Sequence, residues 1–263
     1  MEMAIPLSEI EPLLLEAHTQ TPHLQEVSGW QPDPLRPDVS ELSWTQRTQA
    51  AARWAAAGLS MHADAVRASR FAISLLSIAA PARLADGALT VARDQVAHAR
   101  LGFGLASAYA DRPIGPCDVT PLQSLTSTSD ILDEAISAFC LNATLAAICA
   151  TEARADTEDP AVWDILKTLA DAAWAHTRLG WDVVAWAIHT GPPGTEPALR
   201  ARIEALIEAR AAMPLRHTLL PTDAVLIEHG CPTPAARERL EHAILIQVIR
   251  PCVDQFLANA HQP

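Results

Sequence analysis

Lysine and aromatic residues are scarce in this 263-residue chain, and acidic residues outnumber basic ones. Lys167 is the only lysine, tyrosine occurs once, and aromatic residues make up 5% of the sequence. With 19 Lys and Arg against 31 Asp and Glu, the formal net charge is −12. Nucleic acids and anionic membrane surfaces both attract a basic face. The charge balance therefore argues against either as the main partner.

Several familiar chemical signatures are also missing. The five cysteines, an odd number, form no C-x-x-C pair, which indicates reduced thiols rather than a disulfide framework. There is no Gly-rich phosphate loop, no G-x-S-x-G nucleophile motif and no H-E-x-x-H zinc motif. The corresponding nucleotide-binding, hydrolase and zinc-protease chemistries are not indicated.

Targeting and membrane signals are weak as well. The first residues are acidic where a secretory signal needs basic ones. No window offers the roughly 20 uncharged apolar residues that span a bilayer. The best run, Phe71–Pro81, is short and is bordered by Arg70 and Arg83. We therefore expect a cytoplasmic protein without a membrane segment.

Alanine, leucine and other good helix formers dominate what is present, and they predict an all-α protein with a sizeable core. Pro81 should end one long helix, and Asp159 with Pro160 should begin another as its N-cap and first residue. The expected helices cover approximately residues 7–18, 44–79, 82–110, 129–155, 160–189, 196–212 and 233–258.

Three parts follow from this order of elements. Residues 1–40 form a short helix and a proline-punctuated lead, and residues 41–192 form a bundle of four long helices in two hairpins. A long crossover with three prolines joins the hairpins. Residues 193–263 form a C-terminal helical extension that packs on the bundle.

An internal repeat marks the second helix of each hairpin. The segments AHARLGF (97–103) and AHTRLGW (175–181) place a histidine and a glycine at matching positions, which predicts approximate two-fold symmetry. At helical spacing, the neighbours of His98 and His176 are mostly small or apolar, so both imidazoles should point inward. Gly102 and Gly180, four residues later, allow either close helix packing or space for a ligand.

The chain resembles a bacterial ferritin-like family whose members carry EHAS…FARF, DE-x-R-H-A-x-L-C-F, E-G-C-x-x-E-T-L-A and DEARHA-x-L-A-W. The corresponding segments here are MHADAVRASRF, DQVAHARLGF, SAFCLNATLA and AAWAHTRLGW. RPIGP and HGCPTPAARERL extend the likeness over roughly residues 41–257. It implies a ferritin-like four-helix bundle. Such bundles hold two metal ions with one Glu on each of two helices and Glu-x-x-His on the other two.

This sequence departs from that pattern at every metal-binding carboxylate. The residues in place of the four glutamates are Met61, Gln95, Asn142 and Ala173. Two divalent ions bring about four positive charges, whose desolvation none of these side chains offsets. The remaining His98 and His176 would bind one Zn or Ni weakly. We therefore expect no metal cofactor beyond such a weak mononuclear ion.

The resemblance also assigns a role to Asp94. In such bundles the Asp before Glu-x-x-His orients the opposite histidine, and the counterpart of Asp94 in the last helix is Ala172. We expect Asp94 near His176, with no carboxylate near His98. The pKa of His176 should then be raised and that of His98 lowered. His176, His98 and Asp94 would form an acid–base set without metal, or Asp94 would simply hold a relic histidine.

The lost glutamates leave volume that must be filled, wet or liganded. We expect a ligand pocket lined by Met61, Gln95, Asn142, Ala173 and Trp174, with Trp181 beside it. His62, one residue off the ligand stripe, should face a neighbouring helix.

Three functions follow as hypotheses. The first is a metal-free binding or accessory protein, whose core pocket holds a small molecule or peptide or which pairs with a partner protein. The second is a metal-independent enzyme of specialised metabolism that uses the His and Asp set. The third is a di-iron-like oxidase with atypical ligands. Apolar tail segments such as AILIQVI make a homodimer reasonable.

Overall fold

The computed structural model describes residues 4–14, 24–32, 35–118, 122–125, 127–215 and 224–259, and these residues are mostly helical. The prediction of an all-α protein is confirmed. In chain order the elements are α1 (Leu7–Leu14), β1 (Leu24–Gln25), α2 (Trp44–Ser77), α3 (Ala82–Ala110), β2 (Gly115–Pro116), α4 (Thr128–Glu134), the π-helix η1 (Ala135–Asn142), α5 (Ala143–Ala155), α6 (Pro160–Thr190), α7 (Thr195–Ala211), α8 (Ala224–Glu228), α9 (Pro234–Ile244), the π-helix η2 (Leu245–Ile249) and α10 (Arg250–Asn259).

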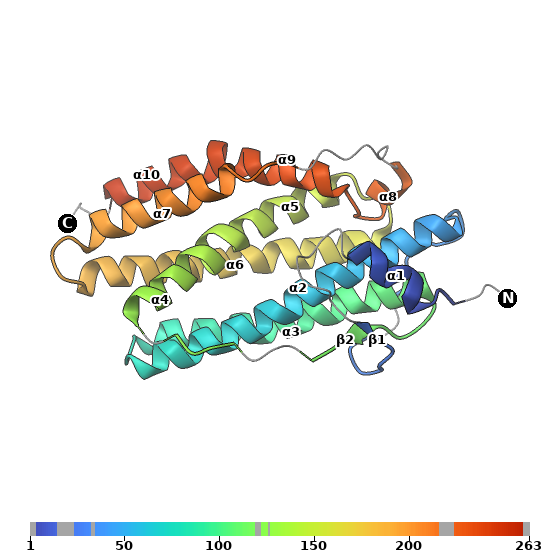
Figure 1. The fold of residues 1–263 in the computed structure, drawn as a ribbon, viewed down its shortest axis with the longest axis horizontal. Coiled ribbons are helices and arrows are strands. Elements are labelled where there is room, and N and C mark those ends of the chain that lie inside the picture. The colour runs from blue at the N-terminus through green and yellow to red at the C-terminus, as the bar shows by residue number, and fades with distance from the viewer. Residues whose placement is uncertain are drawn as a thin grey trace.

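Two long helical hairpins form the centre of the structure. The first is α2 with α3, and the second pairs the continuous α4–η1–α5 segment with α6. The hairpins meet where α3 packs against α6 and α4 packs against α2. Figure 1 shows α7, α9 and α10 along the edge of the second hairpin, away from α2 and α3. The structure thus places the C-terminal helices on the second hairpin.

Local sequence signals explain where the long helices begin. Ser43 and Gln46 form a reciprocal capping box at the start of α2. Asp159 caps α6, because one of its carboxylate oxygens accepts from Val162 N at 2.9 Å. Its other oxygen accepts from Asp38 N at 2.6 Å, which attaches the N-terminal lead to the start of α6. The expected N-cap is confirmed.

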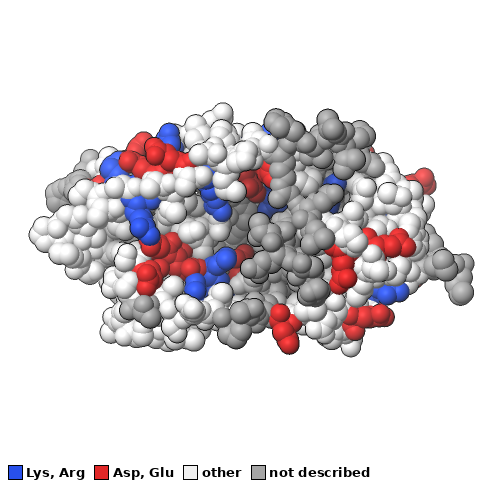
Figure 2. Space-filling model, in the orientation of Figure 1, with Lys and Arg blue, Asp and Glu red and all other residues white. Residues whose placement is uncertain are grey.

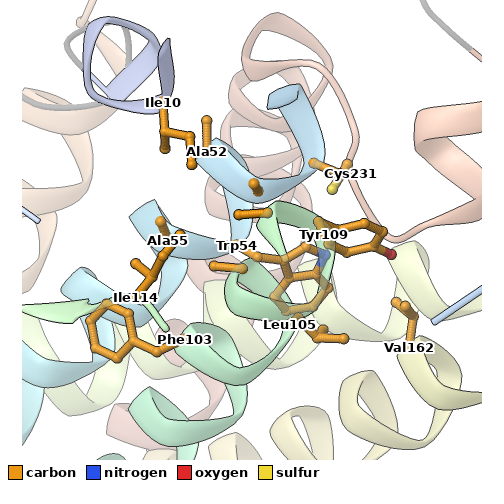
Figure 3. Close-up of a cluster of buried hydrophobic side chains, with 14 of the residues drawn as sticks. Ile10, Ala52, Trp54, Ala55, Phe103, Leu105, Tyr109, Ile114, Val162 and Cys231 are labelled. Carbon is orange, nitrogen blue, oxygen red and sulfur yellow. The ribbon is translucent and has the colours of Figure 1, made fainter. Parts of the chain in front are cut away.

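A cluster of buried apolar side chains joins α1, α2, α3 and the start of α6. Trp54, Tyr109 and Val162 belong to it and are drawn together in Figure 3. The loop after α8 is hydrogen-bonded into this cluster, since Trp54 Nε1 donates to the His229 carbonyl at 3.2 Å and Tyr109 Oη lies 2.8 Å from His229 Nδ1. Two further clusters lie between the hairpins and beneath the C-terminal helices.

Glycines bring the helices of each hairpin unusually close together. A Cβ at Gly102 would lie 2.8 Å from Gly58 Cα in α2. A Cβ at Gly180 would lie 2.7 Å from Cys140 N in η1. Of the two expected uses of the repeated glycine, the structure shows close backbone packing at both positions.

The structure differs from the sequence expectation in several elements. The two π-helices and the short antiparallel pairing of β1 with β2 were not expected, and neither was α8. Hydrogen bonds from residue i to i+5 leave no clear mark on apolar periodicity. The first expected helix ends at Leu14 within the described residues, and positions 15–18 lie outside them.

The expectation about apolar length is also corrected. Phe71–Pro81 is not the best apolar run, because the helical segment Thr128–Ala155 is long and apolar enough to cross a membrane by length and composition. In the most apolar window of this segment, 56% is buried within the fold. The face in Figure 2 shows acidic and basic side chains intermixed, with no extended basic area.

We predict that Gly102→Ala lowers the free energy of unfolding by about 1–3 kcal/mol, because the new methyl group meets backbone atoms that can move only if α2 and α3 separate. Gly87→Ala, in the same helix, is the control. Its Cβ would meet the flexible end of Leu179, and helix propensity favours alanine by up to about 1 kcal/mol. Chemical denaturation measures both variants. Equal stability of the two would contradict the proposed backbone contact.

Candidate functional site

The two repeated histidines face each other across the junction of the hairpins. His98 lies on α3 and His176 on α6, with ring centroids 5.9 Å apart and planes inclined by 38°. Both residues are buried, at 6% and 3% exposure. The expectation that both imidazoles point inward is confirmed, and the repeat places them as a pair.

Asp94 lies beside one histidine only. Its Oδ2 is 3.4 Å from His176 Nε2, a long hydrogen bond. Because an ionised carboxylate can only accept, this contact places the His176 proton on Nε2. The ring of His98 makes no hydrogen bond to any residue that the structure describes. The expected proximity of Asp94 to His176 is confirmed.

Burial sets the charge of both imidazoles. It lowers the pKa of His98 to about 4, with a further lowering by His176 and a partial offset from Asp94. The pKa of His176 is also lowered, because desolvation outweighs the hydrogen bond and the charge of Asp94. The expected rise for His176 is therefore wrong. The Asp94 side chain, 31% exposed, compensates too little, and because both pKa values are lowered, both rings are neutral at pH 7.

Two of the four substituted positions leave buried oxygen atoms without partners. Gln95 Oε1 and Asn142 Oδ1 are inaccessible to solvent and accept no hydrogen bond from the residues that the structure describes. Gln95 precedes His98 by three residues and so lies on the same face of α3. Asn142 is the last residue of η1, three residues after Phe139, which packs between the hairpins. Each unpaired carbonyl costs about 1–3 kcal/mol in the absence of a donor.

The other two substituted positions are apolar. Ala173 is buried and precedes His176 by three residues on α6. Met61 is partly buried and packs against the cluster that contains Trp54. The four substituted positions therefore combine two neutral amides with two apolar side chains.

Three neighbouring residues lie elsewhere than expected. Trp174 is 48% exposed. It precedes the inward-facing His176 by two residues, and residues two apart lie on nearly opposite sides of a helix. Trp181 packs on Phe256, with ring centroids 4.9 Å apart, under the C-terminal helices. His62 meets Trp30 of the N-terminal lead edge-on at 4.9 Å rather than a neighbouring helix. None of the three faces the histidine pair.

The donor set does not fit the dimetal centre that the resemblance implies. No three His, Cys, Asp or Glu side chains among the described residues lie close enough together to share a metal ion. Within the described part of the chain, Asp94 is the only carboxylate that forms a hydrogen bond with either imidazole. One such charge leaves most of the roughly four positive charges of two divalent ions without compensation.

A cluster of ion pairs that sequence reasoning missed connects α2 to α4. The Glu134 carboxylate forms ion pairs with Arg67 Nε at 3.2 Å and with Arg70 Nη2 at 2.6 Å. Arg67 Nη1 also pairs with Asp64 Oδ1 at 2.5 Å. Burial raises the pKa of Asp64. The spacing of Asp64, Arg67 and Arg70 along one helical face was the available signal. Because its charges are paired with one another, the cluster ties the hairpins together.

No protein-family model, no curated protein and no solved structure matches this chain. The ferritin-like resemblance therefore depends on the repeated motifs and on the paired hairpins.

The depressed pKa of His98 predicts a pH-dependent stability. In the unfolded chain the imidazole takes a proton near pH 6.5, whereas in the folded chain it does so near pH 4. The unfolding free energy should therefore fall as the pH drops from about 6.5 to 4. His98→Gln should remove about 1–3 kcal/mol of that fall.

Denaturant unfolding of the wild type and the variant across this pH range measures the effect. His189→Gln, which changes an exposed histidine on α6, is the control and should keep the wild-type slope. An NMR titration of His98 with a midpoint at or above pH 6.5 would contradict the proposed burial.

Proposed function

We propose that this protein is a ferritin-like helical bundle without a dimetal centre, and that it binds a small polar organic molecule beside His98 and His176. The repeated motifs, the two hairpins and the facing histidines support the ferritin-like relationship. The loss of all four metal-binding carboxylates supports a function that does not use paired metal ions. A cytoplasmic location remains our prediction.

The observation that carries this proposal is the pair of buried carbonyl oxygens on Gln95 and Asn142. Native proteins pair most buried polar atoms with protein groups, ligands or ordered water, so an unpaired carbonyl marks a position for a donor. Both atoms are acceptors, so a suitable ligand presents N–H or O–H groups. Alcohols, amines and amides have this chemistry.

The electrostatics restrict the ligand further. The imidazoles are neutral at pH 7, and Asp94 contributes the nearest negative charge. The Asp94 side chain is 31% exposed, so it reaches from solvent to buried His176. A neutral or singly positive molecule suits this arrangement, whereas an anion would meet repulsion from Asp94.

A metal-independent enzyme is the second candidate, and the state of the imidazoles favours it. A neutral histidine can accept a proton, and Asp94 stabilises the imidazolium that forms on His176. His98, 5.9 Å away between ring centroids, would assist on the same ligand. This alternative requires that turnover is lost when both histidines are replaced in a chain that still folds.

Because Gln95 and Asn142 have unpaired acceptors, we predict that replacing them has opposite effects on protein stability and on ligand binding. Gln95→Met and Asn142→Leu each remove a buried carbonyl while keeping the approximate volume, so the unfolding free energy of the ligand-free protein should stay equal or rise by up to about 2 kcal/mol. Gln31→Met is the matched control. The Gln31 amide donates to the Ile114 carbonyl at 2.7 Å, and its loss should cost about 1–3 kcal/mol.

Denaturant unfolding provides the stabilities, and native mass spectrometry of freshly purified protein detects co-purified organic molecules. A bound molecule of the predicted class should appear with the wild type and the Gln31 variant and be reduced at least tenfold in the Gln95 and Asn142 variants. Destabilisation of both site variants by the same amount as the control, with ligand content unchanged, would contradict the proposal.

We also predict that protein purified after iron supplementation contains far less than one iron per chain. The reason is the shortage of anionic ligands around the histidine pair. Elemental analysis measures the metal content, and His98→Ala with His176→Ala should abolish any residual Zn or Ni binding. Two iron ions per chain would support the oxidase hypothesis instead.

A further inference from the structure

A hollow of about 190 Å³ lies between η1 and α7, apart from the histidine pair. Its walls are mostly apolar, with one charged side chain among them. The lining residues are Ser137, Leu141, Leu206, Ala209, Arg210 and Met213. Leu141 and Leu206 belong to the cluster beneath the C-terminal helices, whereas the histidines lie where the two hairpins meet.

Arg210 contributes a cationic group without a hydrogen-bond acceptor. Its Nη1 is inaccessible to solvent and has no partner among the residues that the structure describes. Glu241 lies near enough to favour the charged form, but its carboxylate is already paired with Arg237 Nε at 2.9 Å. Guanidinium groups do not lose their proton in proteins. The Nη1 of this partly buried guanidinium therefore lacks a direct counter-ion among the described residues.

The neighbouring arginine on α7 differs in this respect. Arg202 forms an ion pair with Asp133 of α4 and is 53% exposed. Its charge is satisfied before any ligand arrives. Arg210 is thus the side chain in this region that an anion would relieve most.

The size of the hollow limits the ligand. An apolar cavity of about 150 Å³ holds one benzene molecule. The present hollow, at about 190 Å³, has room for one ring or a short branched chain together with a small polar group.

We propose that this hollow binds a small aromatic or short-chain carboxylate. The carboxylate lies on the Arg210 guanidinium, whose parallel N–H groups match its two oxygens. The apolar body lies between Leu141 and Leu206, and the Ser137 hydroxyl offers a further donor. This site is independent of the proposed function of the histidine pair, because it takes an anion and uses different residues.

Benzoate is the probe for the test, with benzyl alcohol as the uncharged compound of the same shape. Isotope-labelled full-length protein should show intermolecular NOEs from benzoate to the Leu141 and Leu206 methyl groups. Benzyl alcohol should bind at least tenfold more weakly, because it cannot form the ionic contact. Absence of these NOEs at saturating benzoate, or equal affinity for the two compounds, would overturn the proposal.

Three variants sharpen the result. Arg210→Met should weaken benzoate binding at least tenfold, whereas the matched control Arg202→Met should leave it unchanged. Leu206→Trp should block binding by filling the hollow. Equal weakening by Arg210→Met and Arg202→Met would indicate a general charge effect and contradict the site. If Arg210→Met fails to fold by circular dichroism, the wild-type NOEs and the benzyl alcohol comparison still decide.

The two proposals can fail separately. Gln95→Met and Asn142→Leu should leave benzoate affinity unchanged, because neither residue lines the hollow. A loss of benzoate binding in those variants would show that the probe occupies the histidine region instead.

Discussion

Backbone contact at two glycines sets the helix spacing on which the rest of this structure depends. Gly102 of α3 lies against Gly58 of α2, and Gly180 of α6 lies against Cys140 of η1. On α3 and on α6, a histidine (His98 or His176) precedes the glycine by four residues, about one helical turn. Both hairpins are therefore narrow near the level where the His98 and His176 rings meet. Such tight packing excludes water, and the exclusion of water decides the charge of both rings.

The desolvated histidine pair shows how an interior can keep polar groups without keeping charge. In the family that the motifs resemble, metal cations and carboxylates neutralise one another. Here the carboxylates are replaced by two apolar side chains and two amides, and burial keeps the imidazoles neutral. The amide oxygens of Gln95 and Asn142 then remain as the uncompensated groups. Because an apolar residue would be less costly at either position, their presence supports the proposed ligand with donor groups.

Much of the fold could be predicted from local signals. Helix boundaries are marked by capping and proline chemistry that acts within a few residues, as at Pro81, Asp159 and Pro160. Helical periodicity correctly predicted that His98 and His176 point inward. The π-helices could not be predicted, because their hydrogen-bond pattern depends on contacts such as that of Cys140 with Gly180. The exposure of Trp174 was predictable from the same periodicity, since it lies two residues from His176.

The pKa of His176 illustrates a different limit. The sequence identified the favourable neighbour, Asp94, but the sign of the shift depends on how deeply each group is buried. His176 is almost fully enclosed, whereas the Asp94 side chain remains in contact with water and is separated from the ring by a long hydrogen bond. Water screens the charge of Asp94, so the attraction of this carboxylate for a protonated His176 does not offset the cost of burying the imidazolium. Depth of burial is a property of the assembled hairpins, and no motif encodes it.

The π-helix η1 links the parts of this structure that we consider functional. Phe139 and Cys140 pack against Gly180, Asn142 supplies one of the unpaired acceptors, and Leu141 lines the hollow beside Arg210. Hydrogen bonds from i to i+5 widen a helical turn and redirect its side chains, and such turns are frequent at functional sites. Since η1 spans only eight residues, the wall of one proposed site is also part of the surroundings of the other. A substitution that restored regular α-helical geometry here would displace groups at both.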